Sequence, residues 1–369
     1  MAATVLTPGS RRPLRPLAGT PTMVTVVLRR NWGRLLAWFA YVVGLLGYVG
    51  LYYRRTFTTQ RALDDFAALS SSAGMRAITG EAADPATLGG AVWTKIWMTL
   101  ALGLAFGVVL LVTRNGRADE AAGRSELLRS RVLGIHASSV ATWAVVALLC
   151  VFAGAGASVV AVLVGLDPAG TGHSGSWLLG LSVTGVGLVA LGLSAVAGQV
   201  ASSARGANAL GCALVGVAYL LRMTGDLGGG GATWASPIGW GEETRPWGRE
   251  RWWPLALQLA LALALLALAT VLEERRDHGS GLLPDRAGRP GAPRRWATPA
   301  GLSLRLGRGA LLGWTVTVVL AGLVLGSVIS SMQDLLRDAS PEVAQRLGGT
   351  GAEALTAVVV RLLALLVAV

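Results

Sequence analysis

The chain has 369 residues, of which 53% are hydrophobic and only 14% are charged, and its formal net charge is +12. A soluble domain of this length carries charge on about a quarter of its residues. Together with a mean hydropathy of +0.57, this composition excludes an ordinary soluble protein. The positive charge does not indicate nucleic-acid binding, because the arginines lie at the borders of apolar runs.

Apolar runs of about 20 residues recur along the chain, which predicts an all-α polytopic membrane protein. The runs are continuous rather than alternating, so a β-barrel is disfavoured. The predicted spans are residues 35–53, 96–113, 140–165, 177–201, 207–221, 253–272 and 310–330, and an eighth begins near residue 355.

The segments between the spans suggest four regions. Residues 1–34 form a cytosolic tail, whose first 23 residues we expect to be disordered and not a cleavable signal peptide, followed by an amphipathic interfacial helix over residues 24–34. Residues 35–272 form a first six-span unit and residues 273–309 a cytosolic linker rich in Gly and Pro. Residues 310–369 begin a second unit, with span seven and part of span eight.

Orientation follows from the basic residues of alternate loops, since cytosolic loops carry an excess of Lys and Arg. The loops on the N-terminal side of the membrane hold 20 basic residues, and those on the other side hold 11. This predicts a plasma-membrane protein with a cytosolic N-terminus, and places residues 114–131 in the cytosol.

An internal repeat links the first and seventh spans. Residues 34–38 (Arg-Leu-Leu-Ala-Trp) and 311–314 (Leu-Leu-Gly-Trp) open similar spans at an offset of 276 residues, and a polar loop follows each span. A second six-span unit would then be cut short, which makes this chain a C-terminally incomplete twelve-span protein. The alternative is a natural protein that ends in a short hydrophobic tail.

Catalytic and metal-binding motifs are missing from the sequence. It has no phosphate loop, no HExxH, no CxxC and no G-x-S-x-G. We therefore expect no enzyme activity, no metal site and no cofactor bound by this chain. His136 at the end of a polar loop is interpreted as a solvated residue, and Cys150 and Cys212 as buried small hydrophobes.

The predicted spans contain few polar side chains. Gln199, Asn208 and Gln258 are the strongest polar groups in or beside them, and Arg222 borders one span. Ion-driven carriers usually need ionisable groups near the midplane of the membrane, so this composition argues against such a carrier. One span is rich in glycine, which favours close helix packing over space for a cargo, at Gly180, Gly185, Gly187, Gly192 and Gly198.

Residues 114–131 form an Arg-rich polar segment between two apolar runs. Helical spacing predicts one cytosolic helix with an apolar face and a charged face, and pairs Glu120 with Arg124 at i,i+4. Such a helix could be moved by a partner protein, or it could be a solvated loop that obeys the positive-inside rule. The candidate coupling residues are Arg117, Asp119, Glu120, Gly123, Arg124, Glu126, Leu128 and Arg131.

Residues 236–254 form a second polar segment, on the predicted external side. Pro237 and Pro246 should break regular structure there, and tryptophans prefer the membrane interface. Anchoring at the external border is the simpler role, and a gate or a surface in contact with cargo is the alternative. The residues singled out are Trp240, Arg245, Trp247, Trp252 and Trp253.

Three stretches resemble one family in the correct order. They are residues 117–128 (Arg-Ala-Asp-Glu-Ala-Ala-Gly-Arg-Ser-Glu-Leu-Leu), residues 236–254 around Ser-Pro-Ile-Gly-Trp, and residues 272–277 with the following linker and residues 311–314. The chain resembles actinobacterial ATP-binding-cassette exporter permeases of type 2, in the family associated with polyketide antibiotics such as tetronasin.

The resemblance implies two six-span halves in one polypeptide and a separate ATPase subunit, which acts as a dimer and binds the ATP. It implies that residues 114–131 contact that ATPase and that a small amphiphilic or apolar compound is exported, with antibiotic resistance as a consequence. The alternative hypothesis is a membrane protein that ATP does not drive, either a secondary carrier or an assembly scaffold.

Overall fold

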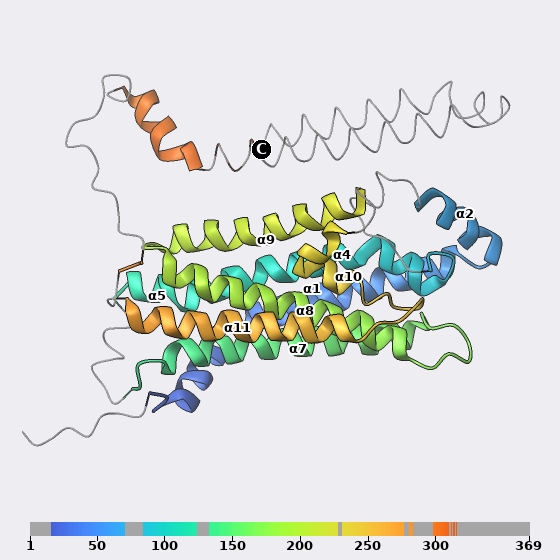
Figure 1. Cartoon of the computed structure of the whole chain (residues 1–369), viewed down its shortest axis with the longest axis horizontal. Helices are drawn as coiled ribbons and strands as arrows, with labels where there is room; N and C mark the ends of the chain where they lie inside the picture. Colours follow the sequence, from blue (N-terminus) through green and yellow to red (C-terminus); the bar gives the residue numbers. More distant parts are fainter. Residues whose placement is uncertain are drawn as a thin grey trace, which may run out of the picture.

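The structure is a computed structural model. It describes residues 16–70, 84–123, 133–227, 231–276, 280–282 and 298–309, together with residues 311, 313 and 315. Six long apolar helices run along a common direction and form one bundle (Figure 1). They are α1 (Thr20–Thr56), α4 (Leu88–Asn115), α7 (Ala137–Val164), α8 (Ser174–Val200), α9 (Ala204–Leu227) and α11 (Trp253–Arg275).

Four shorter elements lie near the two ends of the bundle. α5 (Arg117–Ala121) follows α4 at one end, and at the other end lie α2 (Gln60–Ser70), the 3-10 helix η1 (Ala232–Ala235) and α10 (Pro237–Glu242). The prediction of an all-α polytopic membrane protein is confirmed. The first six predicted spans each correspond to one of the long helices. The seventh and eighth spans lie outside the described residues, except for residues 311, 313 and 315.

Residues 24–34 are helical, as expected, but they do not form a helix of their own. α1 begins after Gly19, whose φ of 81° lies in the left-handed region, and has Pro21 in its first turn. It then continues through the first span to Thr56 without a break. The amphipathic segment and the span are therefore one rod of 37 residues, and the interfacial position of its first turns stays a prediction.

The core of the bundle lies around α8, which packs against α4, α7, α9 and α11. Glycines make the closest approaches possible. A Cβ added to Gly180 would lie 2.1 Å from the carbonyl oxygen of Gly154 on α7, and one added to Gly185 would lie 2.0 Å from Oε1 of Gln258 on α11. The packing role predicted for the glycines of α8 is confirmed at these two positions and at Gly187 and Gly192, whereas Gly198 faces open space.

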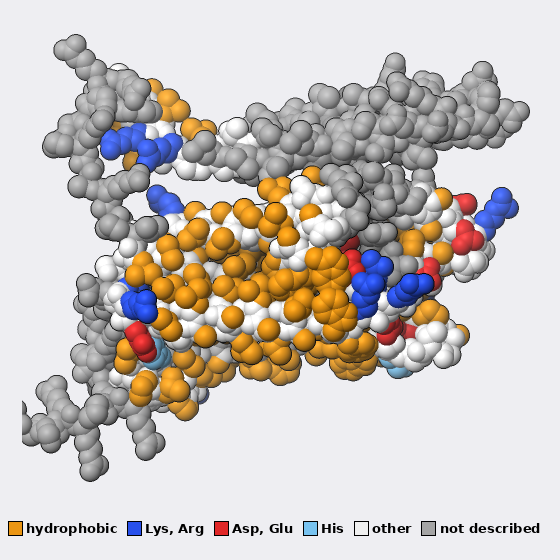
Figure 2. All heavy atoms as spheres, in the orientation of Figure 1, with side chains coloured by type: hydrophobic (Ala, Val, Ile, Leu, Met, Phe, Trp, Pro, Cys, Tyr) orange, Lys and Arg blue, Asp and Glu red, His pale blue; other side chains and the backbone are white. Residues whose placement is uncertain are grey.

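The outer surface of the bundle is apolar between two charged ends (Figure 2). α1, α7 and α11 present large exposed hydrophobic side chains, such as Leu36, Phe152 and Leu263. The 23 residues of α11 extend about 35 Å at 1.5 Å per residue, enough to cross a hydrocarbon layer of about 30 Å. Water does not solvate such a surface favourably, so its natural surroundings are lipid.

The two cysteines are both free. Cys150 is fully buried and lies in contact range of Gly187, as expected for a small hydrophobe. Cys212 on α9 is only half-buried. The prediction of a buried thiol is therefore confirmed for Cys150 and only in part for Cys212.

Candidate functional site

The polar segment predicted to be one helix is divided by glycines. α4 ends at Asn115, and Gly116 leaves helical geometry with φ −107° and ψ −93°. The short helix α5 then ends at Ala121, and Gly123 adopts a φ of 70° in the left-handed region. The prediction of a continuous helix over residues 114–131 is therefore wrong, because glycine ends helices readily in these conformations.

Half of the predicted coupling residues fall within the described part of this segment. These are Arg117, Asp119, Glu120 and Gly123. The other four, Arg124, Glu126, Leu128 and Arg131, lie outside the described residues, as does any pair between Glu120 and Arg124. The structure therefore describes only the first part of the segment. The two acidic side chains in this part, Asp119 and Glu120, both contact distant parts of the chain.

Contacts with α1 hold the beginning of the segment. The guanidinium of Arg30 on α1 donates to Oδ2 of Asp119 at 2.5 Å and also to Oδ1 of Asn115. The amide of Asn31, which is 1% exposed, donates to the same Oδ1 atom at 2.8 Å. One turn of α1 therefore binds both the end of α4 and the middle of α5.

Contacts with the end of α11 hold the other side of α5. The carboxylate of Glu120 accepts hydrogen bonds from Arg276 at 2.5 and 2.9 Å and from Arg117 at 2.5 Å. Arg276 also donates from Nε to Oε1 of Gln199 at 2.5 Å, and from NH1 to the carbonyl oxygen of Ser280 at 3.0 Å. Two-pronged guanidinium–carboxylate pairs fix orientation as well as distance, so α5 is positioned relative to α8, α11 and the residues after α11.

Arg117 shows where the amphipathic prediction fails. Helical spacing placed Arg117 and Glu120, with Arg124 and Arg131, on one charged face, and the resemblance assigned the segment to contact with an ATPase. In the structure Arg117 is only 3% exposed and Glu120 binds Arg276. These two side chains of the predicted charged face lie inside the chain, and the exposed positions of the described segment are instead Arg114, Ala121 and Ala122.

His136 belongs to the same end of the bundle. Its Nδ1 lies 2.8 Å from Oε2 of Glu273 and its Nε2 lies 3.1 Å from Oε1 of Glu274, both near the end of α11. Ser139 donates to Glu273 at 2.6 Å. His136 is 8% exposed, so its interpretation as a solvated loop residue is wrong. Burial favours the neutral ring, but the hydrogen bonds to Glu273 and Glu274 outweigh it and raise the pKa of His136.

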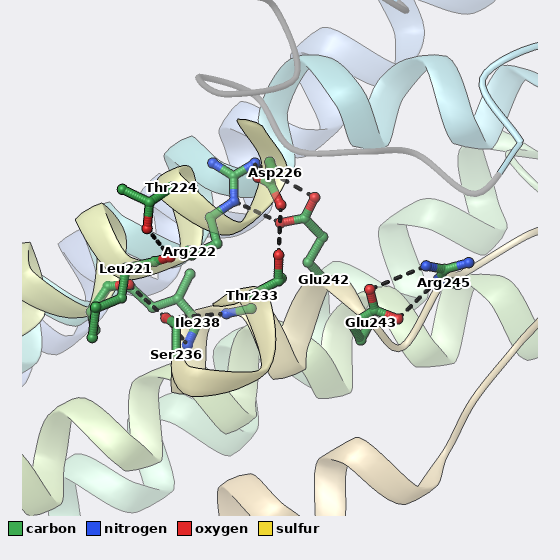
Figure 3. A network of polar contacts seen from close by, with 12 residues as sticks. Leu221, Arg222, Thr224, Asp226, Thr233, Ser236, Ile238, Glu242, Glu243 and Arg245 are labelled. Carbon is green, nitrogen blue, oxygen red and sulfur yellow. Dashed lines mark hydrogen bonds and ion pairs between the residues drawn. The ribbon is translucent and has the colours of Figure 1, made fainter. Parts of the chain in front are cut away.

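The second predicted segment, residues 236–254, begins with a helix instead of a break. The Ser236 hydroxyl accepts hydrogen bonds from the backbone N–H groups of Ile238 and Gly239, and Pro237 occupies the first turn of α10 (Figure 3). Proline fits there because the N–H that it lacks would have no helical partner. Trp240 follows, and its Nε1 donates to the carbonyl oxygen of Trp234 at 2.7 Å.

The tryptophans of this segment divide into two kinds. Trp252 and Trp253 are 47% and 51% exposed, as membrane-interface residues should be, and Trp253 stacks on Trp234 with ring centroids 4.9 Å apart. Trp247 is only 8% exposed and adopts a φ of 60°. Trp247 therefore does not present its ring to the surroundings of the bundle, as an anchoring residue would.

Trp247 is instead a packing residue between loops. Its indole Nε1 donates to Oδ1 of Asp167 at 2.8 Å, and its ring lies where a Cβ on Gly89 or Gly175 would be within 2.5 Å. Asp167 also accepts hydrogen bonds from the backbone and the side chain of Ser176. Trp247 thereby joins the segment before α11 to the loop between α7 and α8.

Ionisable groups are also buried inside the bundle, which the sequence did not indicate. Arg222 was expected at the border of the fifth span, but α9 continues to Leu227 and Arg222 has no exposed surface. Its side chain contacts Asp226 at 2.5 Å and Glu242 at 2.7 Å. Next to them, near the surface, Arg245 and Arg251 pair with Glu243 at 3.1 and 2.8 Å.

Comparison with known proteins finds similarity to a drug-efflux permease. Residues 296–369 match the family model described as "Multidrug efflux system permease Rv1217c, C-terminal domain". The chain is also 37% identical over 350 residues to the "Multidrug efflux system permease protein Rv1217c" of Mycobacterium tuberculosis. The alignment covers 93% of this chain and 63% of that protein. Over nearly all of its length, the chain is therefore similar to a membrane permease of a multidrug efflux system.

Proposed function

We propose that the chain is part of a permease that exports an amphiphilic or apolar compound and is driven by a separate ATPase subunit. The observation that carries the proposal is the position of α5, which Arg30 of α1 and Arg276 after α11 hold from two sides. A force applied to this segment would act on the first and the last long helix of the described bundle together. Similarity to an efflux permease supports the same conclusion.

On this proposal residues 114–131 face the cytosol and contact a dimer of ATPase subunits, which bind the ATP. Closing of that dimer would displace α5, and the bundle would alternate between inward-facing and outward-facing states. The cargo is a small amphiphilic molecule, for which a polyketide antibiotic is one example. The N-terminus is then cytosolic, in agreement with the excess of basic residues on its side of the membrane.

Co-purification and ATP hydrolysis test the proposal. The permease, expressed with a candidate ATPase subunit, should purify as a complex whose ATP hydrolysis rises when an exported compound is added. Replacing Glu120 and Arg124 by alanine should lower the stability of the permease, because Arg276 loses its acceptor, and should abolish stimulation and export by the folded complex that remains. Normal export by this variant would contradict the coupling role of the segment.

A carrier driven by an ion gradient is the second candidate. The buried contacts of Arg222 with Asp226 and Glu242 favour it, because charges inside a membrane bundle often mark ion pathways. Export from energised vesicles separates the two candidates. Transport that requires ATP and persists after the proton gradient is collapsed supports the ATP-driven permease, and transport that requires the gradient alone supports the carrier.

A further inference from the structure

The short helix α10 lies inside the end of the bundle and not on its surface. The Ser236 hydroxyl at its start donates to the carbonyl oxygen of Ala218, nine residues before the last residue of α9, Leu227. At 1.5 Å per residue, this contact lies about 13 Å inward along α9. Ile238 and Glu242 are both buried. After α9 the chain therefore turns back and re-enters the bundle.

The first turn of α10 closes an apolar pocket. Pro237 and Ile238 form one wall of it, and the other walls include Ala105 of α4, Val186 of α8 and Val215 of α9. The free volume of this pocket is about 10 Å³, which is the space that a single water molecule needs. As the structure stands, the pocket has no room for anything larger than a water molecule, and displacement of α10 would widen it.

Both sides of α10 are bound to one buried cluster of charges on α9 (Figure 3). Nε of Arg222 donates to Glu242, the last residue of α10, at 2.7 Å. The NH2 group of Arg222 lies 2.5 Å from Asp226, which accepts a hydrogen bond from Thr233, three residues before Ser236, at 3.1 Å. Separating buried partners of this kind leaves uncompensated charge, so the cluster holds α10 in place.

The other contacts of α10 include a close glycine contact and a neutral hydrogen bond. Gly241 lies against Trp97, whose ring would be 2.9 Å from a Cβ at that position. On the α11 side, Nε2 of Gln258 donates to the carbonyl oxygen of Pro237 at 3.0 Å. Glycine contacts of this kind bring elements close without interlocking side chains. Once the charged contacts are released, neutral hydrogen bonds such as those of Ser236 and Gln258 are what remains to hold the helix.

We propose that α10 is a displaceable plug at this end of the bundle and that the pair between Arg222 and Glu242 is its latch. Release of the latch lets α10 withdraw and opens the apolar pocket between α4, α8 and α9. If the chain exports a compound, this is a gate at the end opposite α5. The plug itself requires neither an ATPase nor a cargo, so it can be disproved while the proposed function stands.

Thiol labelling tests the plug directly. The full chain carries Ile238→Cys as a reporter and Cys212→Ala to remove the half-buried thiol, and it is reconstituted in lipid nanodiscs. A charged maleimide should label the reporter thiol slowly, because Ile238 is 3% exposed. Adding Glu242→Gln should accelerate labelling at least about tenfold, since the rate follows the population of the open state. Cys150, which is fully buried, reports any unfolded fraction, and this fraction is subtracted.

Two further variants separate the latch from general loosening. Glu243→Gln removes the partner of Arg245 and Arg251 but leaves the buried cluster intact, so the labelling rate should not change. Gly241→Val places a side chain against Trp97 and should displace α10 without touching the charges, so labelling should accelerate.

Three outcomes overturn the proposal. The first concerns the protein that keeps Arg222 and Glu242. If its Ile238→Cys thiol is labelled as fast as a Trp252→Cys thiol at an exposed position, α10 is not a plug. If neither Glu242→Gln nor Gly241→Val changes the labelling rate of the reporter thiol, the plug cannot be displaced. Acceleration by Gly241→Val alone shows that the latch is assigned to the wrong pair.

Discussion

Arg276 and Glu120 are 156 positions apart in the sequence, yet the guanidinium of Arg276 donates two hydrogen bonds to the Glu120 carboxylate, at 2.5 and 2.9 Å. Both side chains are nearly buried, with exposed fractions of 4% and 12%. The pair joins the polar segment after α4 to the end of α11. It makes α5 part of the bundle, where the sequence suggested an independent cytosolic helix.

Glu120→Ala should destabilise the protein and uncouple it from a driving partner. The change leaves Arg276 and the buried Arg117 without their shared acceptor, which should lower the free energy of unfolding by about 2–3 kcal/mol. Thermal unfolding in detergent measures the loss. The exposed neighbour Arg275 provides the control, since Arg275→Ala should change stability by less than about 0.5 kcal/mol. Equal effects of the two variants would contradict a structural role for the pair.

His136 should make stability depend on pH. Its hydrogen bonds to Glu273 and Glu274 raise the pKa of His136 above the ordinary value of 6.5. A raised pKa in the folded state contributes stability that is fully present below the ordinary value and is lost as the pH rises through the folded value. The unfolding temperature should therefore fall across this interval.

The variant His136→Gln should flatten that part of the pH profile. His173→Gln is the matched control, because His173 is 62% exposed and contacts a different acid, Asp167. It should leave the profile unchanged. The unfolding temperatures of the parent, His136→Gln and His173→Gln are measured in the same series of buffers of increasing pH. A His136→Gln profile identical to that of the parent would refute the prediction.

Arg222→Ala should cost far more stability than Arg245→Ala. Arg222 has no exposed surface and contacts two buried carboxylates, so its loss leaves them uncompensated, at about 3–5 kcal/mol. Arg245 is 34% exposed and pairs with Glu243 near the surface, where such pairs contribute less than about 1 kcal/mol. Chemical or thermal unfolding measures the free energy of unfolding of the two variants. Similar losses in both would show that the buried cluster is not needed for folding.

Gly180→Ala should weaken the contact between α7 and α8. The new methyl group would lie 2.1 Å from the carbonyl oxygen of Gly154, which the backbone cannot accommodate without moving. Overpacking of this kind costs about 1–3 kcal/mol. Gly198→Ala on the same helix meets nothing within 4 Å, and alanine is the better helix former, so this variant should be at least as stable as the parent. A stable Gly180→Ala protein would contradict the observed crossing.

The long helices could be predicted from the sequence because each one is encoded locally. A run such as Trp253–Arg275 is apolar over enough residues to cross a membrane, whatever its neighbours are. The glycines of α8 likewise indicated close packing before any partner was known. The ends of the helices were less predictable, since α9 continues past the expected border through Arg222 and Asp226. Those charges are tolerated inside the bundle because they pair with each other and because Glu242 comes back to meet Arg222.

The polar sites illustrate the limit of local patterns. Helical spacing assigned Arg117 and Glu120 to one charged face of a cytosolic helix, and it had no means to identify Arg276 as the group that Glu120 binds. The same is true of His136 with Glu273, and of Trp247 with Asp167. Each pair joins residues from distant parts of the chain, so no periodicity within one segment reveals it.

The sequence by itself determined that this protein is a bundle of apolar helices with charged ends, because hydrophobicity and helix length are properties of single segments. Only the tertiary structure decided which charges meet. A buried arginine needs an acid at hydrogen-bond distance, and packing of the helices brings Glu242 to Arg222 and Arg276 to Glu120. These two contacts define the plug at one end of the bundle and the joined segment at the other.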